Sequence, residues 1–256
     1  MAVRVATVAF EGVEARPVDV QVQISSGSVV FNVVGLGDKA VAESRERVRA
    51  ALIASGLALP AKRITVNLAP ADMPKEGSHY DLPIALGILA ATKQLNAENL
   101  GDWLIAGELS LSGATRPVRG ALAMARLARS LGKRGVLLPG ISAEEAAMVE
   151  GVAVYRVDSL DRAVRFLSGE FPLHPLDAVA ARHGPRRTTT DRDNAGYADF
   201  SEIKGQHALR RAVEVAVCGF HNLLMLSDIS PGTALRGTRQ TDRTTCFRIP
   251  VMKSGV

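Results

Sequence analysis

The stretch that decides the fold reads KRITVNLAPADMPKEGSHYDLPIALGILAATKQL and spans residues 62–95. Apolar and polar side chains alternate over its first part, so the sequence predicts a half-buried strand at 62–68. Nearly all side chains over 81–95 are apolar, which predicts a helix buried on all sides. A core helix that follows a strand so closely indicates helices packed on a sheet.

The loop between this strand and this helix holds a PKEG turn at residues 74–77. Short polar side chains at a helix start accept hydrogen bonds from the first free N–H groups. We therefore expect Ser78 and Asp81 to cap a helix that begins at about Leu82 and has Pro83 in its first turn.

Strand and helix patterns of apolar residues also occur on the N-terminal side of this stretch. VDVQVQI (18–24) predicts a strand, and VVFNVVGL (29–36) after the SSGS turn reads as its hairpin partner. Asp38 is placed as the N-cap of a further helix, which Gly56 ends. The side chains that this helix turns inward are Val41, Val48 and Leu52.

On the C-terminal side, strands and helices alternate. A strand is predicted at 103–113 and a helix at 121–132, closed by Gly132. Strand, helix, strand and helix then follow at 135–139, 143–151, 152–157 and 160–169. Because strands cluster early and strand–helix alternation comes late, the sequence predicts an α+β fold with helices on a mixed sheet.

The periodic pattern divides the chain into four parts. Residues 1–170 read as one folded domain, and the Pro- and Arg-rich segment 171–198 reads as a flexible linker. Structure resumes over 199–226, with an amphipathic helix at 206–218 and a short buried strand. Residues 227–256 lose all periodicity and are predicted to be disordered.

Composition narrows the class of protein. The chain has 256 residues and is 47% hydrophobic and 22% charged, as soluble globular proteins are. Cys218 and Cys246 are too few for a disulfide framework, which favours a cytoplasmic location. We find no signal peptide and no apolar run of about 18 residues, so no membrane span is predicted. The net charge is +5, and residues 227–256 contribute +3 of it.

Three stretches resemble one family. They are FNVVGLGDKAVAESRERVRAAL (31–52), NLAPADMPKEGSHYDLPIALGILAA (67–91), and DFSEIKGQHALRRAVEVA followed by HNLLML (199–226). Together they resemble the ComM/YifB proteins, also called Mg-chelatase-like AAA+ ATPases, over roughly residues 1–226. Gly37 departs from the family pattern, which usually has Pro there.

The resemblance implies a Lon-protease-like domain of the ribosomal S5 domain 2-like fold, joined by a linker to an AAA+ motor. It also implies homo-hexameric DNA helicases that use ATP and Mg²⁺ to drive branch migration during natural transformation. We therefore expect a ComM-like N-terminal region.

The phosphate loop of such a motor should begin at Ser227. That loop needs a lysine for the phosphates and a hydroxyl for Mg²⁺, yet no lysine lies between Lys204 and Lys253. Arg236 is too bulky to replace it. The chain also shows no Walker B strand, sensor or arginine finger, so we expect neither ATP nor Mg²⁺ to bind. A truncated or frameshifted motor is favoured, and an ATPase with a diverged loop is the alternative.

A Lon-like peptidase is the second alternative. Aligning the PKEG turn places the serine nucleophile of that class on His79, one residue after Ser78, and its lysine base on Leu122. The nearby Arg119 stays protonated and cannot serve as a base. Ser78, His79 and Asp81 as a triad are disfavoured because neighbouring turn residues rarely converge. No catalytic residue and no metal site is therefore predicted.

DNA contact is expected to be weak and independent of sequence. The candidates on the helix after Asp38 are Lys39, Arg45, Arg47 and Arg49. Because Glu43 and Glu46 lie among them, a salt-bridged solvent face is favoured over a phosphate-binding one. Further candidates are Lys62, Arg63, Lys75, Arg186 and Arg187. The sequence thus predicts a non-catalytic module that binds DNA or a partner protein.

Overall fold

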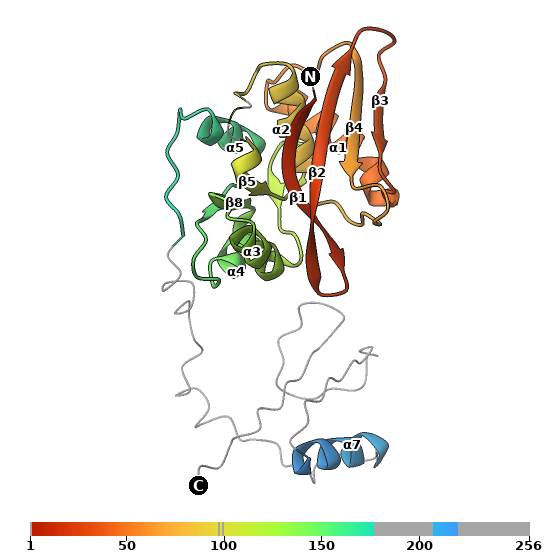
Figure 1. Ribbon diagram of the computed structural model, residues 1–256, viewed down its shortest axis with the longest axis vertical. Coiled ribbons are helices and arrows are strands. Elements are labelled where there is room, and N and C mark those ends of the chain that lie inside the picture. The colour runs from red at the N-terminus through yellow and green to blue at the C-terminus, as the bar shows by residue number, and fades with distance from the viewer. Residues whose placement is uncertain (1, 97, 99, 177–206, 220–256) are drawn as a thin grey trace. The chain divides into compact units, whose positions relative to one another are not determined.

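The computed structural model describes residues 2–96, 98, 100–176 and 207–219 (Figure 1). The chain divides into two units, Met1–Arg186 and Arg187–Val256. The first unit contains a seven-stranded mixed sheet with helices packed on it. Of the second unit, the structure describes helix α7 (His207–Cys218) and the following Gly219.

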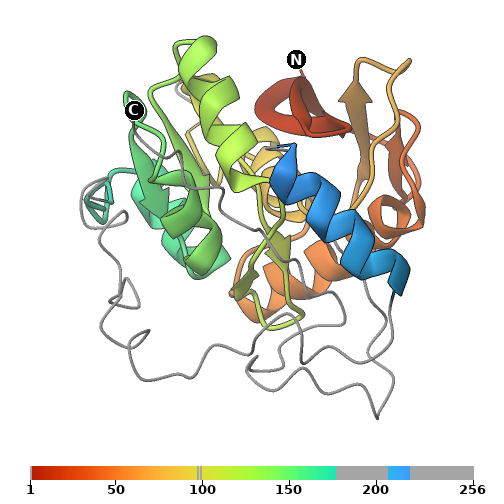
Figure 2. The same cartoon turned by 90° about the horizontal axis from the view of Figure 1, so that it is seen from below.

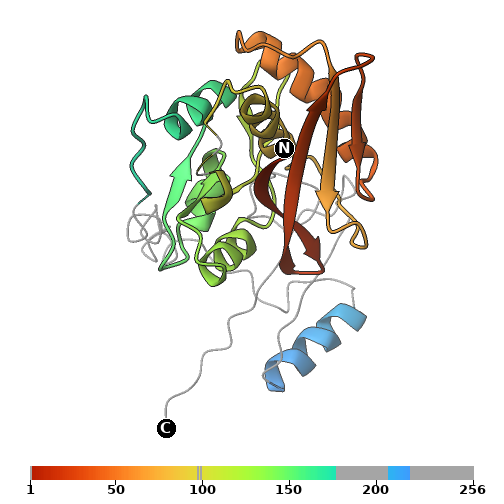
Figure 3. The same cartoon turned by 45° about the horizontal axis from the view of Figure 1, so that its top comes forward.

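The main sheet contains both antiparallel and parallel strand pairs (Figure 3). Its strands are β1 (Val3–Glu11), β2 (Glu14–Ser25), β3 (Phe31–Val34), β4 (Arg63–Ala69), β5 (Trp103–Ile105), β8 (Gly135–Leu138) and β9 (Val154–Arg156). The order across the sheet is β3-β4-β2-β1-β5-β8-β9. β2 runs antiparallel to both β1 and β4, whereas β1, β5, β8 and β9 are parallel.

Helices cover both faces of this sheet. They are α1 (Lys39–Ala54), α2 (Asp81–Ala91), α3 (Ala121–Ser130), α4 (Gly140–Ala146) and α5 (Leu160–Leu167), with a short 3-10 turn η1 (Leu100–Asp102). Side chains of α1, α2 and α5 share one hydrophobic core, and those of α3 and α4 share another. Strand residues alternate between the two cores, since Ile105 belongs to the first and Leu104 to the second.

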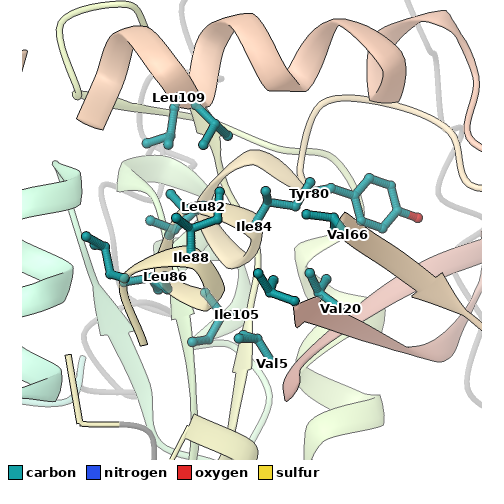
Figure 4. Packing of buried hydrophobic residues seen from close by; sticks show 14 of the residues in the cluster. Val5, Val20, Val66, Tyr80, Leu82, Ile84, Leu86, Ile88, Ile105 and Leu109 are labelled. Atoms are coloured by element: carbon teal, nitrogen blue, oxygen red, sulfur yellow. The ribbon is translucent and has the colours of Figure 1, made fainter. Parts of the chain in front are cut away.

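Helix α2 is the centre of the larger core, as its apolar sequence predicts (Figure 4). Every residue from Asp81 to Ala90 is buried. A Cβ atom on Gly87 would lie 2.6 Å from Cγ2 of Val22, so this glycine lets α2 approach β2 closely. The helix ends at Ala91, four residues before its predicted end at Leu95, and Lys93 just beyond it adopts a φ of +61°.

The strands predicted at 18–24 and 62–68 are confirmed as β2 and β4 and pair with each other. The hairpin predicted between 18–24 and 29–36 is wrong, because β3 pairs in parallel with β4. β4 occupies the edge of β2 along seven residue pairs, and α1 provides the crossover that a parallel partner requires.

Two further differences concern strands. β1 is not among the predicted strands, and it forms a hairpin with β2 through a turn in which Gly12 has a φ of +61°. The strand predicted at 103–113 is split into β5 and β6 (Glu108–Leu109), and β6 pairs with β7 (Thr115–Arg116) in a separate small sheet. The chain leaves the main sheet at Gly107. Its backbone N–H donates to the His79 carbonyl oxygen, and its carbonyl oxygen accepts from the Leu82 N–H.

The predicted α+β class and the remaining strands and helices of the first domain are confirmed, except that the helix predicted at 143–151 is displaced to α4 at Gly140–Ala146. The helix predicted at 206–218 is confirmed as α7. The strand predicted at 221–226, residues 227–256 and most of the linker 171–198 lie outside the described residues. No helix in the described ranges is long and apolar enough to span a membrane.

Candidate functional site

The PKEG turn and the loop before α1 are bonded to each other. The Lys75 N–H donates to the Leu36 carbonyl at 3.0 Å, and the Asp38 N–H donates to the Lys75 carbonyl at 2.9 Å. The Asp38 carboxylate then accepts from the Val41 N–H at 2.8 Å and from the Gly77 N–H at 3.0 Å. Asp38 therefore caps α1, as predicted, and also anchors the turn that leads into α2.

Lys75 lies inside this structure. Its side chain is fully buried, and Nζ donates to the carbonyl oxygens of Pro70 and Met73. Burial lowers the pKa of Lys75, because the charged ammonium loses its water. Lys75 is thus a structural residue, and its place among the candidates for DNA contact was wrong.

Ser78 and His79 follow the turn and point to different partners. The Ser78 hydroxyl donates to the Glu108 carboxylate on β6. Nε2 of the buried His79 lies 2.9 Å from the Val8 carbonyl oxygen, and its ring packs edge-on against Phe10. Burial lowers the pKa of His79, so the neutral imidazole is favoured.

Asp81 forms a buried ion pair with Arg47 of α1. Arg47 Nε and Nη2 lie 2.6 and 3.0 Å from the two carboxylate oxygens, and the Leu109 N–H donates to the same carboxylate at 3.1 Å. Desolvation outweighs these contacts and raises the pKa of Asp81 to about 6. The hydrogen bond to Asp81 raises the pKa of Arg47, which stays charged. The pair ties α1, α2 and β6 together.

The capping roles predicted for Ser78 and Asp81 need correction. Ser78 and Asp81 do not cap α2, whose N-cap residue is Tyr80 and has no side-chain cap bond. A triad of Ser78, His79 and Asp81 is not formed either, because the three side chains bond to Glu108, Val8 and Arg47. The serine therefore has no imidazole to activate it.

The position aligned with the lysine base of Lon-type peptidases is also unsuitable. Leu122 is exposed on the surface of α3 and carries no titratable group. Arg119 is exposed as well. Among the described residues, no group of three or more His, Cys, Asp and Glu side chains is placed to hold a metal ion.

The four DNA candidates of α1 have different environments. Lys39 and Arg45 are exposed and form ion pairs with Glu43 at 3.7 Å and with Glu46 at 3.9 Å. These pairs confirm the predicted salt-bridged solvent face. Arg49 is exposed and, with Arg45, lines a shallow pocket beside residues 29–32. DNA contact by Lys39, Arg45 and Arg49 stays a prediction.

Arg47 differs because its side chain is only 19% exposed and is engaged by Asp81. This ion pair is not among the predicted contacts, although two features of the sequence indicate it. Arg47 lies three residues after Ser44 and four before Ala51, both on the buried stripe of α1. Asp81 is the one acidic residue at the start of an otherwise apolar helix. A buried charge of this kind requires a partner.

The chain matches two family models. Residues 20–141 match "Subunit ChlI of Mg-chelatase", and residues 199–240 match "Magnesium chelatase, subunit ChlI". The second match extends beyond Leu226, the last residue of the predicted family pattern.

Individual relatives cover most of the chain. It is 40% identical over 230 residues to the competence protein ComM of Haemophilus influenzae. These aligned residues make up 90% of this chain and 44% of that protein. It is 39% identical over 231 residues to the YifB protein of Escherichia coli, with 89% and 43% covered. The chain thus spans somewhat less than half the length of these relatives. On this evidence, the chain belongs to the ComM/YifB family of Mg-chelatase-like proteins.

Proposed function

We propose that the chain is the N-terminal region of a ComM-like DNA helicase and serves there as a non-catalytic module that contacts DNA. The similarity to a competence protein supports the helicase context, since competence involves the uptake of DNA. In this proposal the complete relatives use ATP and Mg²⁺ in a hexameric motor for branch migration, and the first domain adds binding surface.

The non-catalytic role is supported mainly by the bonding partners of the side chains that follow the PKEG turn. Ser78, His79 and Asp81 each have a partner that is itself part of the scaffold: a β6 carboxylate, a β1 carbonyl oxygen and the α1 guanidinium. A peptidase of the Lon type needs its serine beside a basic amine. The amine near this turn, Lys75 Nζ, is bonded to two backbone carbonyl oxygens.

We further propose that residues 1–170 have the S5 domain 2-like fold of Lon-type domains. Support comes from the long β1–β2 hairpin, the parallel β3–α1–β4 crossover, and α2 packed beneath them. The proposal retains the fold of the peptidase class and omits its chemistry, as often happens when one fold serves several functions.

Nucleotide binding is a separate part of the proposal. Because the chain has no lysine between Lys204 and Lys253, we propose that it neither binds ATP tightly nor hydrolyses it. Isothermal titration of the chain with ATP and Mg²⁺ tests this, and the expected result is no micromolar binding. Micromolar affinity would favour the alternative of an ATPase with a diverged loop.

The DNA role is tested by comparing the full chain with a version that ends at Leu226. Residues 227–256 carry a charge of +3 and can attract polyanions by themselves. We expect the shorter version to keep sequence-independent DNA binding. Complete loss of binding would mean that the folded part has no DNA site, and the proposed module would then be wrong.

A further inference from the structure

A group of basic residues without an acidic residue between them in the sequence lies in and around α3. Between Glu108 and Glu144 the sequence contains six arginine and lysine residues and no acidic residue. The six are Arg116, Arg119, Arg126, Arg129, Lys133 and Arg134. The α1 helix differs, because its four basic residues share their surroundings with Glu43, Glu46 and Asp81.

The helix directs these charges outward. Ala121, Met124, Ala125 and Ala128 of α3 are buried in the second core, and α3 lies beside α4 on that face of the sheet (Figure 2). Arg126 and Arg129 lie one turn apart on the opposite, exposed side. Arg119 lies before the N-cap residue Gly120, and Lys133 lies after Gly132, so these two basic residues flank the helix at its two ends.

Several of these cations are held by neutral groups. Arg129 donates to the Glu150 carbonyl oxygen at 3.1 Å, and Lys133 donates to the Gly101 carbonyl oxygen at 2.7 Å. The Arg134 guanidinium lies over the Trp103 ring, 5.3 Å from its centroid. In the part of the chain that the structure describes, none of the six forms an ion pair with a carboxylate.

This arrangement suits an anionic partner. A cation that is fixed by a carbonyl oxygen or a ring keeps its full charge, and its side chain loses less conformational entropy on binding. Interaction with the negative end of the helix dipole can account for Arg129 and Lys133, which lie near the C-terminus of α3. It does not account for Arg119 or Arg126, which lie before the helix and in its middle.

We propose that the outer side of α3, with Arg119, Arg126, Arg129 and Lys133, is the surface that binds the phosphate backbone of duplex DNA. The inference rests on the proposed function and assigns its DNA contact to α3 in place of α1. At helical rise α3 itself is about 15 Å long, and Arg119 and Lys133 lie beyond its two ends. One DNA strand carries about four phosphates over that length.

Other partners fit less well. A membrane would require an apolar side that can insert, and the apolar side of α3 is buried. Base stacking on single strands requires exposed aromatic rings, and Trp103 is only 4% exposed. Contact with phosphates alone remains, which gives affinity without sequence preference.

The test uses the full chain and a fluorescein-labelled duplex, with anisotropy measured between about 50 and 200 mM salt. The variants are Arg126→Gln/Arg129→Gln and Arg119→Gln/Arg126→Gln, the second of which removes no side-chain hydrogen bond or ion pair between described residues. The matched control is Arg162→Gln/Arg165→Gln on α5, which makes the same charge change at the same three-residue spacing. A fourth variant, Arg45→Gln/Arg49→Gln, tests α1. Thermal unfolding checks that each variant is folded.

We expect each α3 double variant to make the negative slope of log affinity against log salt less steep by about 2. The α5 control should have the same slope as the unmodified chain. Loss confined to the α1 variant would overturn the α3 assignment and leave the proposed DNA role standing. Absence of duplex binding by the unmodified chain would overturn both. Equal binding of polyglutamate by the unmodified chain, lost in the same α3 variants, would replace DNA by an acidic protein partner and overturn the inference.

Discussion

Arg47 and Asp81 form a buried ion pair inside the first domain. Their ion pair lies between α1 and α2 and also holds the Leu109 N–H of β6. Removing one partner of a buried pair leaves an uncompensated charge, whereas replacing both by apolar groups is often close to neutral. The pair therefore matters for stability mainly because each charge needs the other.

The first prediction concerns Arg47→Met. This variant leaves the Asp81 carboxylate without its guanidinium, and we expect the free energy of unfolding at neutral pH to fall by roughly 3–5 kcal/mol. The double variant Arg47→Met/Asp81→Leu should recover most of that loss. Arg45→Met, at an exposed position of the same helix, is the control. Urea denaturation measures all of them, and an Arg47→Met variant as stable as Arg45→Met contradicts the assignment.

The second prediction is a pH dependence that comes from Asp81. Its pKa is about 6 in the folded state and 3.8 as a free group, so between these values the folded state binds more protons. Stability from this carboxyl is therefore complete below pH 3.8 and is lost as pH rises through about 6. The difference in pKa corresponds to roughly 3 kcal/mol.

Asp81→Asn is the reference variant for this measurement, because it removes the titrating group and leaves His79 in place. The lowered pKa of His79 makes stability rise with pH, opposite to the effect of Asp81. Both proteins contain His79, so its effect cancels when their unfolding free energies are subtracted. We expect the unfolding free energy of the wild type minus that of Asp81→Asn to decrease from about pH 4 to pH 6. An increase over that range would show that attraction by Arg47 outweighs desolvation.

At the scale of elements, the backbones of β3 and β4 approach each other closely just after the end of β3. Gly35 has a φ of +114°, and a Cβ atom there would lie 2.3 Å from the Leu68 carbonyl oxygen of β4. This close approach brings the loop that holds Asp38 against the PKEG turn. Gly27 has a φ of +133° with nothing within 4 Å of its Cβ position, so it provides a matched comparison.

We predict that Gly27→Ala costs about 1–3 kcal/mol, because only the backbone conformation is unfavourable. Gly35→Ala should cost clearly more, since the backbone of β4 must also move. Chemical denaturation of the two variants gives the difference directly. Equal losses would mean that the contact with Leu68 does not constrain the end of β3.

The elements also show how far the sequence determines the fold. The spacing of apolar residues alone identifies α1, α3 and β4, because their buried faces follow 3.6- and two-residue repeats. It does not choose the partner of β3, since a hairpin with β2 and a crossover to β4 both satisfy the apolar pattern. The Arg47–Asp81 contact joins residues 34 positions apart, and no local pattern specifies its geometry.

At the scale of the whole molecule, charge is distributed unevenly over a scaffold with two cores. The α1 surface mixes both signs, and the surroundings of α3 carry six basic residues in an acid-free stretch. That stretch is visible in the sequence, but bulk net charge conceals it. The fold adds what the sequence cannot provide, namely that α3 buries its apolar side and exposes Arg126 and Arg129.

The central claim, a non-catalytic module that contacts DNA, is tested most directly by duplex binding of the unmodified chain with and without ATP and Mg²⁺. The account predicts dissociation constants of about 10⁻⁴–10⁻⁶ M at physiological salt, a steep loss of affinity as salt rises, and no change on adding ATP and Mg²⁺. Binding that requires ATP, or no salt-dependent binding at all, would contradict it.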